Sequence, residues 1–168
     1  MPKLHLDTDL GGDIDDLCAL AMVLNWPEVE LLAVTTNSDD QGRRAGYARY
    51  VLDLAGREAV AVAAGADASL GCYRVWPGLP DESVYWPEPV SPVSTPLDEA
   101  LTLLERSIEQ GAIIAAIGAF TNLALLEKRS PGILRHANLY LMGGYVFPPQ
   151  VYFPMHYDIG WYENHTGK

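Results

Sequence analysis

The sequence predicts an α/β fold, with a mainly parallel, Rossmann-like sheet that carries helices on both faces. Short, almost continuous apolar runs alternate with segments of helical length, which is typical of parallel strands buried on both sides. The chain has 168 residues, of which 49% are hydrophobic, 20% are charged and 10% are aromatic. Those values suit one globular core and exclude a disordered polymer. No repeat or linker interrupts the pattern, so we expect one domain over 1–168, with a core over about 3–145 and an irregular aromatic tail over 146–168.

The first half of the chain predicts three strand units in order. Residues 4–6 form a short apolar run before an acidic turn, and 14–24 form a helix whose acidic first turn suits the helix dipole. A β-branched run predicts the second strand at 31–36, and a helix follows over 45–54. The third strand is expected at 60–64. The stretch from 71 to 96 holds six of the twelve prolines and predicts a long irregular loop.

The second half predicts two further units. Ser94 or Thr95 is expected to cap a helix that opens at Pro96 and stops at Gly111. The apolar positions of this helix recur on one face: Leu97, Ala100, Leu101, Leu104 and Ile108. The remaining elements are a strand at 113–117, a helix at 121–128 and a strand at 139–142.

Acidic residues and glycines follow the predicted strands. Asp7 and Asp9 end the first strand, and 37–40, 65–67 and 118–122 follow the next three. In open parallel sheets the carboxyl ends of the strands share one edge, and ligands bind outside it. We therefore expect these residues to converge on one site.

The acidic turn over 7–16 predicts a site for a hard cation. It holds five carboxylates in ten residues, and no Cys or His lies within it. Oxygen ligands suit Ca²⁺, and less well Mg²⁺, rather than Zn²⁺. The net charge of -11 disfavours a nucleic acid or an anionic membrane as partner, and leaves cations and small molecules. No secretory signal or long apolar span is present, so we expect a cytoplasmic protein.

The turn Asp-Thr-Asp-x-Gly-x-Asp-x-Asp-Asp resembles the aspartate-rich signature of the inosine-uridine-preferring nucleoside hydrolase family. Four further segments are similar to family landmarks and lie in the same order: Val34-Thr35-Thr36, Ala64-Gly65-Ala66-Asp67, the run 117–124 with its Thr-Asn pair, and Leu141-Met142-Gly143-Gly144. Together the landmarks cover about residues 4–145.

The resemblance implies Ca²⁺-dependent hydrolysis of the N-glycosidic bond of a ribonucleoside. It implies that Asp9 is a metal ligand and the general base, and that Asp16 and the backbone carbonyl of Thr121 are further ligands. Asp7 is the alternative first ligand. The substrate contacts that the resemblance implies are Asp15, Asp40, Asn122, Met142, His156 and Asp158.

The family carries a His-Asp pair downstream, and this sequence contains no such pair. We therefore expect a truncated member with slowed hydrolysis, which self-associates into a homo-oligomer through its exposed edge and aromatic tail. Two alternatives stay open. One is a non-catalytic metal or sugar binder, or a subunit completed by another chain. The other is a haloacid-dehalogenase-like phosphatase with Asp7 as nucleophile and Mg²⁺.

Overall fold

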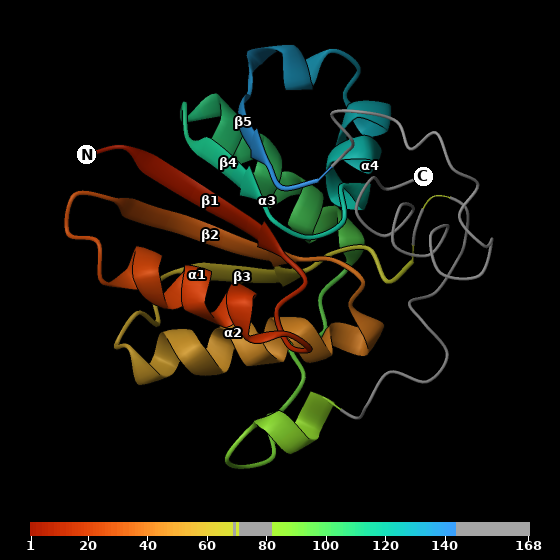
Figure 1. Cartoon of the computed structure of the whole chain (residues 1–168). Helices are drawn as coiled ribbons and strands as arrows, with labels where there is room; N and C mark the ends of the chain where they lie inside the picture. Colours follow the sequence, from red (N-terminus) through yellow and green to blue (C-terminus); the bar gives the residue numbers. More distant parts are fainter. Residues whose placement is uncertain (69, 71–81, 144–168) are drawn as a thin grey trace, which may run out of the picture.

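A five-stranded parallel sheet forms the centre of the computed structural model, which describes residues 1–68, 70 and 82–143. The strand order is β3-β2-β1-β4-β5, and every neighbouring pair is parallel (Figure 1). The strands are β1 (Lys3–Thr8), β2 (Glu30–Thr36), β3 (Ala61–Ala64), β4 (Ile113–Ala116) and β5 (Asn138–Leu141). The predicted fold class is confirmed.

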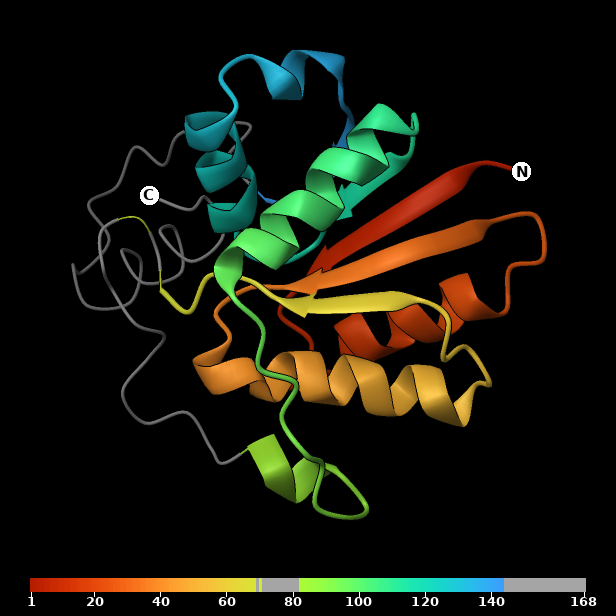
Figure 2. The same ribbon diagram turned by 180° about the vertical axis from the view of Figure 1, so that it is seen from behind.

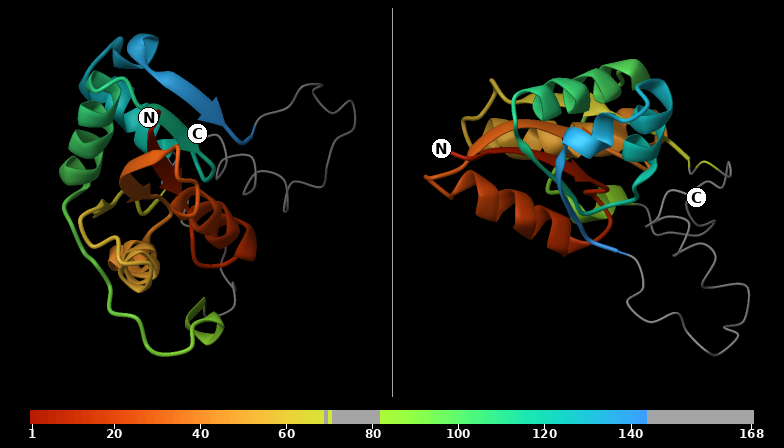
Figure 3. Two further views of the ribbon diagram at one scale, coloured as in Figure 1. Left: turned by 90° about the vertical axis from the view of Figure 1, so that its left-hand side faces the viewer. Right: turned by 90° about the horizontal axis from the view of Figure 1, so that it is seen from above.

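Helices cover both faces of the sheet. The helices are α1 (Ile14–Leu24), α2 (Arg43–Leu54), α3 (Leu97–Glu109) and α4 (Thr121–Arg129), and the short 3-10 turns are η1 (Asp40–Gly42), η2 (Glu82–Tyr85) and η3 (Ile133–His136). The chain proceeds from β1 through β2 to β3 at one edge of the sheet, then crosses to β4 on the other side of β1 and continues to β5 at the opposite edge. Right-handed crossovers in opposite directions must place their helices on opposite faces. Accordingly α1 and α2 lie on one side, and α3 and α4 on the other (Figures 2 and 3).

The sheet separates two apolar cores. The first core lies beneath α1 and α2, and its buried members are Leu6, Leu10, Leu20, Val34, Tyr47, Ala48 and Leu52. The second lies beneath α3 and α4, and its buried members are Leu101, Leu104, Ile108, Ile114, Ala116, Leu123 and Leu126. Successive residues of a strand face opposite sides. Thus Leu6 enters the first core, while its neighbours His5 and Asp7 make their contacts on the other face.

The segment that leads from η2 to α3 runs along α2. A Cβ atom at Gly46 would lie 2.4 Å from the carbonyl oxygen of Ser91, so only glycine permits this approach. The ring of Trp86 stacks on that of Tyr47 with 4.4 Å between the centroids. Packing is therefore the role that the structure gives Trp86.

Thr95 does not cap α3, contrary to the sequence prediction. The cap position is Pro96, which makes no side-chain cap hydrogen bond. The hydroxyl of Thr95 instead accepts a hydrogen bond from the backbone N–H of Ala64 at 2.9 Å. It thereby ties the incoming segment to the end of β3.

The expected stop of α3 at Gly111 agrees with the positive φ of 70° at this residue.

Residues 71–81 of the proline-rich stretch and 146–168 of the aromatic tail lie outside the described residues. None of the helices in the described ranges combines the length and the apolarity that a bilayer crossing requires.

The second core should dominate the stability contributed by α3. Leu104 is fully buried there, whereas Leu54 of α2 is 72% exposed. We expect Leu104→Ala to lower the free energy of unfolding by about 2–5 kcal/mol, because the cavity it leaves cannot fill completely. Leu54→Ala, the matched control, should change it by less than about 1 kcal/mol. Urea titration of both variants measures the difference, and equal losses would show that α3 does not pack as described.

Candidate active site

Polar side chains and backbone N–H groups from four strand ends meet around the carboxylate of Asp7, near the end of β1. Asn37 follows β2, Ala66 follows β3, and Ala119 and Asn122 follow β4. Hydrogen bonds link these segments to one another, although they lie far apart in the sequence. The predicted convergence of the strand ends is therefore present.

Asp7 is fully buried and accepts three hydrogen bonds. Its Oδ1 receives the hydroxyl of Thr35 at 2.6 Å and the amide of Asn122 at 2.7 Å. Its Oδ2 receives the amide of Asn37 at 3.3 Å. The pKa of Asp7 is raised to about 6, mainly by burial; the three donors lower it, and the nearby charge of Asp9 contributes to the increase.

Backbone N–H groups fix the orientation of both amides. The Oδ1 atom of Asn37 accepts the N–H of Ala119 at 3.0 Å, and that of Asn122 accepts the N–H of Ala66 at 2.9 Å. An N–H can only donate, so the NH₂ group of each side chain must point toward Asp7. Asn122 also donates to the carbonyl of Thr36. Its amide is thus committed inside the fold, which favours a bracing role over the substrate contact that the resemblance implied.

Two further acids, Asp9 and Asp16, form a pair close to Asp7. Asp16, in the first turn of α1, is 8% exposed and shares a hydrogen bond with Asp9. The pKa of Asp16 is raised to about 8; burial is the largest cause, the charge of Asp9, that hydrogen bond and the charge of Asp15 act in the same direction, and a bond from Thr8 acts in the opposite one. Two carboxylates in contact cannot both ionise without a compensating charge, so this pair holds a proton or attracts a cation.

The loop after β4 closes over Asp9. A Cβ atom at Gly118 would lie 2.7 Å from Oδ1 of Asp9 and 2.8 Å from Oδ1 of Asn37. A side chain at this position would displace the carboxylate or the amide. Gly118 therefore lets the 118–122 loop, which carries Thr121, approach the acidic turn.

The other predicted site residues differ in accessibility. Asp15 and Asp40 are exposed, Thr121 is 2% exposed, and Met142 is 46% exposed. His156 and Asp158 lie outside the described residues. Within the described ranges, no group of three or more His, Cys, Asp or Glu side chains could hold a metal alone. A cation here would need backbone or water oxygens besides Asp9 and Asp16.

Sequence reasoning missed two buried polar contacts near the site. Asp39 is 2% exposed, and its carboxylate accepts the N–H groups of Arg44 and Ala45 at the start of α2, besides the hydroxyl of Thr36. It therefore anchors α2. His5 is fully buried between Thr35 and Ser107. Ser107 follows His5 by 102 residues in the sequence. Alternation with Leu4 and Leu6 was its only sequence signal, and it indicated a packed residue without indicating a partner.

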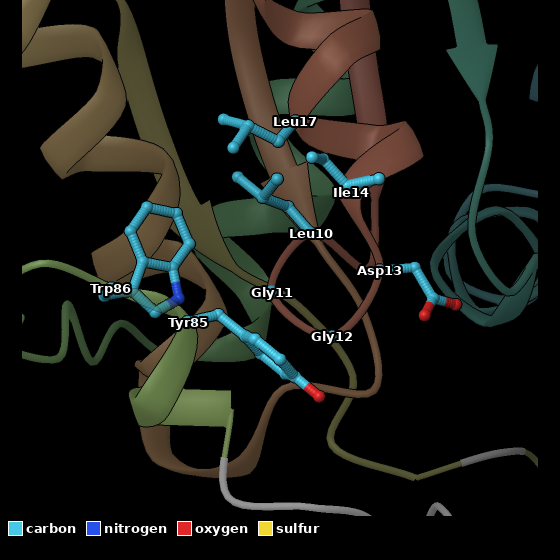
Figure 4. A pocket seen from close by; sticks show the side chains of 8 residues that line it. All are labelled: Leu10, Gly11, Gly12, Asp13, Ile14, Leu17, Tyr85 and Trp86. Atoms are coloured by element: carbon cyan, nitrogen blue, oxygen red, sulfur yellow. The ribbon is translucent and has the colours of Figure 1, made fainter.

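A pocket of about 360 Å³ opens on the other side of the acidic turn. Its walls are mainly apolar and comprise Leu10, Gly11, Gly12, Asp13, Ile14, Leu17, Tyr85 and Trp86 (Figure 4). The carboxylate of Asp13 points away from the aromatic wall. Neither Asp9 nor Asp16 lines this pocket, so it is separate from the carboxylate pair.

Comparison with known proteins decides the family. The sequence profile of the inosine-uridine preferring nucleoside hydrolase family matches residues 4–160. The chain belongs to this family. It is similar to uridine nucleosidase 1 of Arabidopsis thaliana, with 32% identity over 86% of this chain and 46% of the relative. It is also similar to the inosine-uridine preferring nucleoside hydrolase of Crithidia fasciculata, with 31% identity over 86% of this chain and 49% of that protein.

Solved structures of nucleoside hydrolases share the fold. A plant nucleoside hydrolase superposes with a TM-score of 0.72 at 25% identity, covering 86% of this chain and 48% of that one. A purine-preferring ribonucleoside hydrolase from Gardnerella vaginalis gives a TM-score of 0.70 at 26% identity, covering 86% and 49%. The chain spans about half the length of these nucleoside hydrolases. Family membership and the complete burial of Asp7 both speak against the phosphatase alternative, which needs an accessible nucleophile.

The buried histidine predicts a pH dependence of stability in this nucleoside hydrolase fold. Burial lowers the pKa of His5 from 6.5 to about 3, so the unfolded chain binds a proton that the folded chain excludes. The stabilisation is complete above pH 6.5 and is lost as the pH falls toward 3. Lowering the pH from about 7.5 to about 5 should cost wild type about 2 kcal/mol more than His5→Gln. Urea unfolding at both pH values tests this, and equal losses in the two proteins would contradict the burial of a neutral His5.

Proposed function

We propose that this chain takes part in the hydrolysis of the N-glycosidic bond of ribonucleosides, with Ca²⁺ bound at the Asp9–Asp16 pair. The observation that supports the proposal most is this carboxylate pair, which lies at the ligand-binding edge of the sheet in a member of a nucleoside hydrolase family. The named relatives act, by their names, on uridine or on inosine and uridine. We therefore choose these two nucleosides as test substrates.

The residues at the pair fit Ca²⁺. Their donor atoms are carboxylate oxygens, and the buried Thr121 lies in the loop that Gly118 brings against Asp9. A cation between Asp9 and Asp16 would offset, by its charge, the mutual repulsion of the two carboxylates. Ca²⁺ tolerates irregular oxygen cages, whereas Mg²⁺ needs a near-ideal octahedron. The chemistry that a bound Ca²⁺ supplies is to orient sugar hydroxyls and make water easier to deprotonate.

The acids near the turn have different roles in the proposed reaction. Asp9 accepts the proton of the attacking water, since it is partly accessible and is held by the loop at Gly118. Asp15 is exposed on the same turn and binds ribose hydroxyls, with Asp40 as a further sugar contact. Their negative charges stabilise the positive charge that develops on the sugar as the bond to the base breaks. Asp7 braces the site instead of binding the metal, because all its accepted hydrogen bonds come from inside the fold.

Ca²⁺ binding should appear as thermal stabilisation. A ligand that binds only the folded state raises the melting temperature by mass action, and an excess of about 100 times Kd adds about 2.7 kcal/mol. We expect Ca²⁺ to raise the midpoint of wild type and of Asp13→Asn, which changes an exposed acid of the same turn. Asp16→Asn should lose the shift. Identical midpoints for wild type in Ca²⁺ and in chelator would remove the metal from the proposal.

Hydrolysis should depend on Asp9. We expect Asp9→Asn to lower the rate of reducing-sugar release from inosine or uridine by about 10²–10⁴-fold, because an amide cannot take the proton of water. Asp13→Asn serves again as the control. Release of p-nitrophenol from p-nitrophenyl riboside gives a second readout, since that leaving group needs no proton. A chain that binds Ca²⁺ and nucleoside without releasing either product would be the non-catalytic binder instead.

A further inference from the structure

Three side chains continue the hydrogen bonding of Asp7 across the sheet to α3. Thr35 on β2 contacts Asp7 at 2.6 Å, and its Oγ1 lies 2.9 Å from Nε2 of His5 on β1. The Nδ1 atom of His5 lies 2.8 Å from Oγ of Ser107 on α3. Asp7, Thr35 and His5 are fully buried, and Ser107 is 3% exposed.

The number of available protons fixes the direction of every bond in this row. The carboxylate of Asp7 accepts from Asn37 and Asn122, so it also accepts from Thr35, whose hydroxyl has one proton to give. Thr35 must then accept at its own oxygen, which requires a proton on Nε2 of His5. The ring is neutral, because it is buried and faces two hydroxyls instead of an acid, so Nδ1 carries no proton. Ser107 therefore donates to Nδ1.

We propose that Ser107, His5 and Thr35 form a one-directional hydrogen-bond chain that orients Asp7, and that His5 is thereby a positioning residue for the site. Its link to the site rests on the proposed function. Every donor in the chain points toward the carboxylate, so each bond polarises the next in the same sense. The carboxylate in turn holds Asn37 and Asn122, which brace the 118–122 loop beside Asp9.

The chain explains why a histidine lies where a parallel strand normally carries an aliphatic residue. A purely apolar side chain at position 5 would leave the hydroxyls of Thr35 and Ser107 without these partners. The histidine satisfies both and passes one orientation from α3 to the end of β1. The helix and the site thus share one buried polar connection, which the apolar packing of α3 could not supply.

The tautomer of His5 tests the chain directly. In ¹⁵N-labelled wild type near pH 8, correlations between ring protons and ring nitrogens should identify His5 as the Nε2–H form. Thr35→Val removes the hydroxyl at nearly constant volume, so the proton should move to Nδ1 and donate to Ser107. Thr35→Ser keeps the hydroxyl and should keep the Nε2–H form. An Nδ1–H form in wild type would overturn the proposal, even if the valine variant fails to fold.

Ca²⁺ titration calorimetry tests the link to the site. Loss of a hydrogen-bond partner of a metal ligand typically weakens binding by about 10–100-fold. Thr35 acts one step further from the metal, through Asp7 and the loop beside Asp9, so we expect a loss of about 10-fold, the lower end of that range, for Thr35→Val and recovery in Thr35→Ser. Equal Kd values for wild type and Thr35→Val would overturn the positioning role. Failure of wild type to bind Ca²⁺ would overturn the proposed function separately, and the tautomer measurement would still decide whether the chain exists.

Discussion

Burying the carboxylate of Asp7 carries a large free-energy cost, and the surrounding structure is arranged to offset it. A charged group without water needs hydrogen-bond donors from the protein, and here they come from Thr35, Asn37 and Asn122. These residues belong to β2, to the loop after it and to α4. The hydrogen bonds to this one carboxylate therefore join segments that lie up to 115 residues apart in the sequence.

The acids of this sheet edge share a residue type but differ in their surroundings. Asp7 is saturated by donors, Asp39 anchors the start of α2, and Asp9 and Asp16 face each other. The repulsion between the two carboxylates of the last pair is the feature that a bound cation would relieve. Asp7 and Asp39 thus hold the scaffold together, and the Asp9–Asp16 pair is the part of this edge to which we assign the proposed chemistry. In the proposed function the site depends on Asp7, although this side chain is fully buried.

The fold was predictable from sequence because apolar runs and their spacing determine it. The strand at 31–36 and the helix at 14–24 lie close to their predicted bounds, and the strand ends converge as parallel topology demands. The errors concern side chains whose partners lie far along the chain. Thr95 bonds Ala64 instead of capping α3, and the sequence did not indicate that Asn122 donates to Asp7. His5 and Ser107 meet only after α3 packs on β1, and no local pattern encodes that contact.

Equilibrium unfolding of Asp7→Asn tests the bracing role most directly. The substitution keeps the size of the side chain, but it places an NH₂ group among three donors and removes the charge they solvate. We predict a loss of about 2 kcal/mol or more in the free energy of unfolding, because the new NH₂ group and the donor that it faces are both left unsatisfied, at about 1–3 kcal/mol for each buried group. Asp13→Asn, an exposed change in the same turn, should cost less than about 0.5 kcal/mol. A loss below about 1 kcal/mol for Asp7→Asn would contradict the account, because the strand ends would then be held together without this carboxylate.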